Sequence, residues 1–232
     1  MGQSLVNLVH HEMRLQWRNG IYIAYAFVLV TYILLLQFLA PQLPNWVPAL
    51  IIYTDPVVLG FFFLGALMML EKSEGVRAAL AITPMRAADY YWAKVISLTI
   101  ISVAAAIILG LFLHASINWP FYLGATLLIS FTYTSISFPI ALHFKTATSY
   151  LMGAAALLTP IVTPLFLALL DPLPFWAILI PATAQFRMML VALGVFQASI
   201  FDLVSMISIC ILSALLSAWL GLHALKGEFG QK

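Results

Sequence analysis

The feature of this sequence that most constrains its fold is a succession of long apolar runs. A helix needs about 20 apolar residues to cross about 30 Å of hydrocarbon, and runs of that length recur at 21–40, 46–70, 95–113, 121–142, 151–170 and 203–222. Of the 232 residues, 64% are hydrophobic and 8% are charged, whereas a soluble domain carries about 25% charged residues. The sequence therefore excludes a water-soluble globule. It predicts an all-α polytopic membrane protein with six transmembrane helices in a single domain, 1–232.

The first 20 residues predict an amphipathic helix that lies in the plane of the membrane surface. At 100° per residue, one side of this helix gathers the apolar residues Leu5, Val6, Val9, Met13 and Trp17. The other side gathers His10, His11, Arg14 and Arg18. No short apolar core leads to a small-residue cleavage site, so we expect no signal peptide. A charged tail that only fixes the topology is the simpler alternative.

Residues 173–200 are apolar enough to resemble a seventh span, but they contain Pro174, Pro181, Gln185 and Arg187. An arginine near the middle of the bilayer costs about 2.5–3.5 kcal/mol on insertion scales. We therefore expect an external re-entrant segment, made of two short helical pieces broken at Pro181.

The distribution of lysine and arginine favours six spans with both termini in the cytoplasm. In that arrangement the cytoplasmic cations are Arg14, Arg18, Lys72, Arg77, Arg86, Lys94, Lys145, Lys226 and Lys232. Only Arg187 lies outside, which obeys the positive-inside rule. A seventh span would bury Arg187 and move the last two lysines outside.

Several kinds of site are excluded by the residues present. The net charge of +2 is too small and too scattered for a nucleic-acid-binding face. The single cysteine, Cys210, lies in an apolar run and predicts a small packing residue. His11-Glu12 begins like a zinc motif, but its second ligand position is Leu15. We expect no catalytic, metal-binding or cofactor-binding residues and no phosphate-binding loop, so another chain would have to bind any ATP.

Asp55 is a candidate functional residue because an ionised acid is expensive inside a membrane span. Two interpretations stay open: Asp55 has a structural role, in which it caps a helix that starts at Pro56 or belongs to a kink there, or it lies on a transport path. Pro160 and Pro164 interrupt the fifth run and predict a kink or a hinge. The candidates for a transport path are Asp55, Pro160, Pro164, Pro181 and Arg187.

The stretch 71–94 carries seven of the 18 charged residues and predicts a helical hairpin on the cytoplasmic side. Gly75 loosens the end of the preceding helix, and Thr83-Pro84 begins the next one. Tyr90, Tyr91 and Trp92 are expected to anchor that helix at the interface. The simpler alternative is a charged loop that holds the topology.

This stretch resembles the signature of the ATP-binding-cassette (ABC) type-2 transporter permease family. The residues that carry the resemblance are Glu71, Gly75, Leu80, Thr83, Pro84 and Lys94. The amphipathic N-terminal helix, the six spans and the broken pair before the last span agree with it over nearly the whole chain. One departure is Val76-Arg77-Ala78, where the family often has Thr-Leu-Glu.

The resemblance implies a permease subunit of an exporter in the bacterial cytoplasmic (inner) membrane, surrounded by lipid and paired with a second permease chain in a homo- or heterodimer. Cytoplasmic ATP-binding-cassette ATPase subunits would hold ATP and Mg. It further implies that coupling to the ATPase uses Glu71, Glu74, Gly75, Arg77, Thr83, Pro84 and Arg86. The chain is similar to compact drug-export permeases, including those for fluoroquinolones, which implies a hydrophobic or amphipathic, drug-like cargo.

Four alternatives remain at this point. Within the same family, the cargo could instead be a lipid or a polysaccharide. The haem-exporter permease of the same family is also compact and six-spanning. An ion-coupled secondary transporter would use Asp55 as its titrating group. A non-transporting membrane scaffold would use the stretch 71–94 to recruit a cytoplasmic partner.

Overall fold

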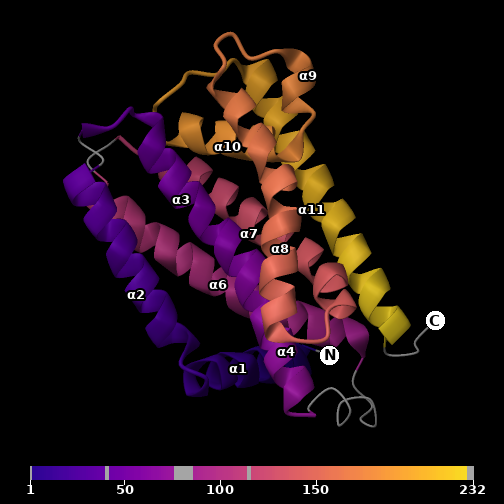
Figure 1. Ribbon diagram of the computed structural model, residues 1–232. Coiled ribbons are helices and arrows are strands. Elements are labelled where there is room, and N and C mark those ends of the chain that lie inside the picture. The colour runs from indigo at the N-terminus through magenta and orange to yellow at the C-terminus, as the bar shows by residue number, and fades with distance from the viewer. Residues whose placement is uncertain (1, 40–41, 76–85, 114–115, 229–232) are drawn as a thin grey trace.

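The structure, a computed structural model, describes residues 2–39, 42–75, 86–113 and 116–228, and every regular element in these ranges is a helix (Figure 1). The α-helices are α1 (Gly2–Arg18), α2 (Ile21–Leu34), α3 (Trp46–Val58), α4 (Leu64–Ser73), α6 (Ala87–Phe112), α7 (Trp119–His143), α8 (Ala147–Val162), α9 (Phe175–Ile178), α10 (Pro181–Ala192) and α11 (Ile200–Glu228). Two π-helical turns, η1 (Leu35–Leu39) and η3 (Leu59–Phe63), and a 3-10 helix, η4 (Thr163–Leu169), continue α2, α3 and α8. The predicted all-α class is confirmed.

In the described part of the chain, six helices are long and apolar enough to cross a membrane, as predicted. They are Ile21–Leu39, Trp46–Ser73, Ala87–Phe112, Trp119–His143, Ala147–Leu169 and Ile200–Glu228. The second and third helices are longer than the apolar runs that predicted them. They include charged residues, such as Glu71 and Lys94, that apolar run length alone does not count.

The two ends of the bundle are built differently. Helix α1 runs across one end, where both termini and the end of α4 also lie (Figure 1). The two short helices α9 and α10 lie at the opposite end, before the last span. Pro181 is the first residue of α10, where its missing N–H costs no helical hydrogen bond. The expected amphipathic helix and broken helical pair are therefore both present.

Helix α7 forms the centre of the bundle and contacts α3, η3, α4, α6, α10 and α11. Its buried surface is rich in hydroxyl side chains: Thr126, Ser130, Thr132, Thr134, Ser135 and Ser137. Ser130 donates a hydrogen bond to Ser102 on α6, with the two oxygens 3.0 Å apart. Small polar residues of this kind let membrane helices approach closely and join across the interface.

Gly221 lies where α11 packs tightly against α7. A Cβ atom at this position would lie 2.8 Å from the backbone oxygen of Ser135, closer than real Cβ contacts. Relief would require the two helices to separate, because the crowded atom belongs to the backbone. Glycine at 221 is therefore a packing requirement of the last span.

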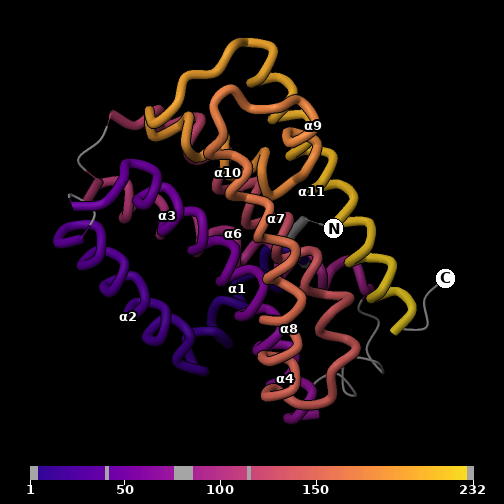
Figure 2. The backbone as a smooth tube through the Cα atoms, turned by 45° about the horizontal axis from the view of Figure 1, so that its top comes forward, coloured from indigo at the N-terminus to yellow at the C-terminus, as the bar shows by residue number. Residues whose placement is uncertain are grey.

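Helix α2 is held more loosely than the central spans. It lies at the edge of the bundle in both views of the backbone (Figures 1 and 2). Only 11% of the most apolar window of this span is buried, compared with 61% for the span Trp46–Ser73. Ile23, Phe27 and Phe38 are each more than two-thirds exposed and point away from the protein. This outward apolar face is typical of a helix that meets lipid or another membrane chain.

We predict that Gly221→Ala lowers the free energy of unfolding by about 1–3 kcal/mol through overpacking, measured by denaturation of the purified protein in detergent. Gly124→Ala is the matched control, because Gly124 lies on α7 with no atom within 4 Å of the added Cβ. Equal stability of the two variants would contradict the close packing of α11 on α7.

Candidate functional site

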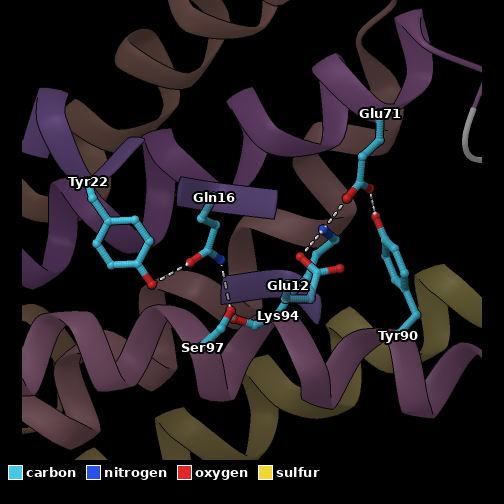
Figure 3. Close-up of polar contacts among 7 residues, drawn as sticks. All are labelled: Glu12, Gln16, Tyr22, Glu71, Tyr90, Lys94 and Ser97. Carbon is cyan, nitrogen blue, oxygen red and sulfur yellow. Dashed lines mark hydrogen bonds and ion pairs between the residues drawn. The ribbon is translucent and has the colours of Figure 1, made fainter. Parts of the chain in front are cut away.

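A buried cluster of charged and polar side chains joins α1, α4 and α6 (Figure 3). At its centre, the Nζ atom of Lys94 donates to Oε1 of Glu71 and, over 3.0 Å, to Oε2 of Glu12. The hydroxyl of Tyr90 donates to the second oxygen of Glu71 over 2.6 Å. The exposed fractions of Lys94, Glu71 and Glu12 are 0%, 2% and 8%. We call these four residues the ion cluster.

A second layer of hydrogen bonds continues the ion cluster along α1 and α6. Gln16, one turn after Glu12, donates from Nε2 to the Ser97 hydroxyl over 2.9 Å. Ser97 in turn donates to the backbone oxygen of Lys94 over 3.0 Å. Tyr22, at the start of α2, donates to Oε1 of Gln16 (Figure 3). The contacts reach from α4 through α6 and α1 to the first turn of α2.

The ion cluster holds two carboxylates and one ammonium group away from water. Such charges are stable in a protein interior only when they are paired and their hydrogen bonds are satisfied. The Nζ atom of Lys94 also lies 4.9 Å from the centroid of the Tyr90 ring, a cation–π distance. The pairing fixes the end of α4 and the beginning of α6 relative to α1.

Helix α1 turns a different face to the protein from the apolar stripe that its sequence suggests. Glu12 and Gln16 are buried, whereas Val6 and Trp17 are 67% and 69% exposed. The i, i+4 spacing of Glu12 and Gln16 is the signal that could have identified the inward face. The apolar stripe alone does not reveal this face, because Glu12 and Gln16 are polar.

Four of the predicted coupling residues lie on either side of the stretch 76–85, at the end of α4 and the start of α6. Glu71 belongs to the ion cluster, and Glu74 ends α4 in an exposed position. Gly75 follows with φ of 72°, a left-handed conformation that favours glycine. Arg86 is the exposed N-cap of α6. Arg77, Thr83 and Pro84 lie outside the described residues, as does the helix start expected at Thr83-Pro84.

The expected interface anchors at the start of α6 face two directions. Tyr90 and Tyr91 are buried, and Tyr91 shares a 2.6 Å hydrogen bond with Ser135 of α7. Only Trp92 is exposed, at 36%. The prediction of an interface anchor was therefore wrong for the two tyrosines, because they fill polar positions between helices.

Asp55 lies inside α3, which runs through it to Val58, so it does not cap a helix that starts at Pro56. Its Oδ2 atom accepts a hydrogen bond of 2.6 Å from the hydroxyl of Tyr25 on α2. Asp55 is 2% exposed, and among the described residues its Oδ1 atom has no hydrogen-bond partner. The capping interpretation is therefore wrong.

The remaining candidate path residues lie on α8, η4 and α10, apart from the Asp55–Tyr25 pair. Pro160 is inside α8, and the 3-10 helix η4 begins at Thr163, directly before Pro164. Pro164 cannot donate to the backbone oxygen of Pro160, which explains the loss of the α-helical pattern there. Pro181 opens α10, whose Thr183 hydroxyl donates to the backbone oxygen of Pro164 over 2.7 Å.

Arg187 is buried in α10 and is paired within the protein. Its guanidinium group donates to the backbone oxygens of Ala168 and Leu170 and lies 3.7 Å from a carboxylate oxygen of Asp171. The ring of Phe196 stacks beneath it, 3.9 Å from ring centroid to Cζ. Burial lowers the pKa of Arg187, and the charge of Asp171 opposes that shift. These contacts fasten α10 to the end of η4.

Comparison with known proteins assigns the chain to no family. No protein-family model and no curated protein matches the chain. The described residues contain no group of three or more His, Cys, Asp or Glu side chains placed to hold a metal ion. Cys210 is fully buried in α11, as expected for a packing residue.

We predict that Lys94→Met lowers the free energy of unfolding by about 3–5 kcal/mol, because it leaves two buried carboxylates without a counter-charge. Denaturation in detergent measures the change. The matched control is Lys145→Met, which removes an exposed lysine from the loop before α8 and is expected to change the stability by less than about 0.5 kcal/mol. A Lys94→Met variant as stable as the control would show that the ion cluster is not needed to hold these helices.

Proposed function

We propose that the chain is the membrane-spanning permease subunit of an ABC exporter in the bacterial cytoplasmic membrane. In this proposal, both termini face the cytoplasm, a separate subunit binds and hydrolyses ATP, and the cargo is a hydrophobic or amphipathic small molecule. The observation that carries the proposal is the ion cluster at the base of the 71–94 hairpin. The resemblance of Glu71, Gly75, Leu80, Thr83, Pro84 and Lys94 to the family signature supports the same assignment.

The ion cluster suits a hairpin that receives force from a cytoplasmic partner. The stretch 71–94 includes the end of α4 and the start of α6, and these two helices are joined at Glu71 and Lys94. A push on a flexible loop would be absorbed by the loop, but a push on two joined helices moves both of them. Because Glu12 binds the same lysine, α1 moves with the pair. ATP-driven closure of the partner would then tilt the spans and change which side of the membrane is open.

The packing of the bundle supports a path between two chains rather than through one. The centre of the single chain is filled by α7 and by the side chains that it buries. The spans Ile21–Leu39 and Ala147–Leu169 bury only 11% and 17% of their apolar windows. These outward faces are available to a second permease chain and to lipid. A dimer could therefore enclose a transport path between its two chains, which the filled centre of a single chain does not provide.

The cations gather as the proposed orientation requires. Arg14 and Arg18 lie on α1, Lys72 is in the last turn of α4, and Lys226 is in the last turn of α11. These elements share the end of the bundle where the termini lie (Figure 1). Under the positive-inside rule this end faces the cytoplasm, where a soluble ATPase has access to the hairpin.

The experiment that tests this function is capture of the tagged protein from its native host in mild detergent, with the co-purifying chains identified by mass spectrometry. We expect a Walker-motif ATPase in the capture, and we expect it to be lost when Glu74→Lys and Arg86→Glu reverse the two exposed charges at the hairpin stems. Lys226→Glu is the matched control, because it reverses an exposed charge at the end of α11. An ATPase absent from the wild-type capture would overturn the proposal and favour an ion-coupled carrier. If the double variant still captured the ATPase, the stretch 71–94 would not be the docking site.

We predict that Gly75→Ala lowers transport per ATP hydrolysed, because an L residue at φ of 72° is strained by about 1–2 kcal/mol and redirects the chain that leaves α4. Hydrolysis and transport are measured together in proteoliposomes that contain the permease and its captured ATPase. Gly194→Ala is the control, since Gly194 has the same φ of 72° but follows α10 at the opposite end of the bundle. Unchanged coupling in Gly75→Ala, or an equal loss in both variants, would contradict a specific role of Gly75.

A further inference from the structure

Asp55 is the buried acid that the coupling mechanism does not use. It is the tenth residue of the span Trp46–Ser73, which at 1.5 Å per residue places it about 14 Å from the start, near mid-membrane. An ionised carboxylate at that depth is costly unless a positive charge accompanies it. No Lys, Arg or His in the described ranges forms an ion pair with Asp55.

The surroundings of Asp55 supply one hydrogen bond and several aromatic rings. The ionisable neighbours that interact with it are Tyr25 and Tyr32 on α2 and Tyr122 on α7. Tyr122 does not donate to Asp55, because its hydroxyl donates to the backbone oxygen of Ala106 over 2.9 Å. Oδ1 of Asp55 therefore remains an acceptor without a donor among the described residues. The faces of aromatic rings attract cations, most strongly where water is excluded.

The wall that closes this position is the loosely held helix α2. The hydroxyl of Tyr25 reaches Asp55, and the Tyr25 ring packs edge-on against Phe63, with the centroids 6.0 Å apart. Farther along the same span, Gln37 donates to the backbone oxygen of Phe112 over 2.5 Å. The opposite face of α2 is exposed. An outward movement of α2 would uncover Asp55 at the cost of few contacts.

The backbone beside Asp55 is also irregular. Pro56 lies inside α3 and cannot donate a helical hydrogen bond, and the π-helical turn η3 follows at Leu59–Phe63. Turns of this kind occur frequently at functional sites, because they widen a helix locally.

We propose that Asp55 binds the positive charge of a lipophilic cation, such as a protonated amine or a phosphonium ion, which enters from the lipid after α2 moves aside. This inference rests on the proposed export function and names its substrate class. The bound cation supplies the charge that Asp55 lacks, and the tyrosine rings cover its apolar substituents. Entry through the pocket of about 600 Å³ between the start of α2, α4 and the start of α8 is disfavoured, because Lys72 and Lys145 line this pocket and repel a cation.

The test is equilibrium binding of radiolabelled tetraphenylphosphonium to the purified permease in lipid nanodiscs, without any ATPase. Binding to this chain alone keeps failure of the inference distinct from failure of the export function. We expect Asp55→Asn to weaken binding by about 10-fold or more, because a charge-assisted contact is lost, and Asp55→Glu to retain it. The neutral triphenylphosphine oxide should bind wild type and Asp55→Asn equally.

Tyr25→Phe separates cation binding from a structural hydrogen bond. It removes the same Tyr25–Asp55 bond but keeps the carboxylate and the aromatic ring at position 25 that covers the cation, so we expect phosphonium binding to be retained or tightened. If Asp55 served only to hold Tyr25, neither Tyr25→Phe nor Asp55→Asn would affect the cation selectively. Equal phosphonium affinity in wild type and Asp55→Asn, or no binding to wild type, would overturn the inference.

A measurement on the wild-type protein tests the same inference without relying on the folding of a variant. Dicyclohexylcarbodiimide modifies buried carboxyl groups, and peptide mass spectrometry locates the modified residue. We expect tetraphenylphosphonium to protect Asp55 from this reagent and triphenylphosphine oxide to leave it unprotected. Modification of Asp55 at the same rate with and without the cation would contradict binding at this carboxylate.

Discussion

The structure depends on one buried lysine. Lys94 is fully enclosed and is shared by Glu12 of α1 and Glu71 of α4, so a single charge joins α4 and α6 to each other and to the distant helix α1. In a low-dielectric interior the attraction is strong, and each partner left alone would be costly. The cluster therefore holds the helices together and also fixes their relative register. The second layer, from Gln16 to Ser97, extends the same constraint along α1.

The molecule combines this rigid unit with a loosely attached helix. The spans built from α3, α4, α6 and α7 bury half or more of their apolar windows, whereas α2 buries 11%. The bond from Tyr25 to Asp55 is one of the few polar links between α2 and the rest of the bundle. A transporter needs both properties, since force requires a stiff element and passage requires one that moves. In our proposal, the ion cluster serves the first need and α2 serves the second.

Much of the fold could be predicted from the sequence, because run length and cation placement are direct consequences of the bilayer. The six spans and the break at Pro181 follow from these rules. The ion cluster could not be predicted in the same way. In the sequence, Glu71 and Lys94 stand out only through the family resemblance, and nothing links Glu12 to them. Only the fold brings the three together. The capping interpretation of Asp55 failed for a similar reason. A Thr-Asp-Pro stretch is typical of a helix start, and the sequence does not show that Asp55 is hydrogen-bonded to Tyr25 of another helix.

The most direct test of the central claim measures whether Lys94 holds α1 and α4 in one position. Cys210 is the sole native cysteine, so a Cys210→Ala background allows spin labels at Arg14→Cys and Ser73→Cys, two exposed sites on these helices. Pulsed electron–electron resonance then gives their distance distribution. The account predicts one narrow distribution that broadens when Lys94→Met is added. An equally narrow distribution in both proteins would contradict the claim that the ion cluster joins the hairpin stems to α1.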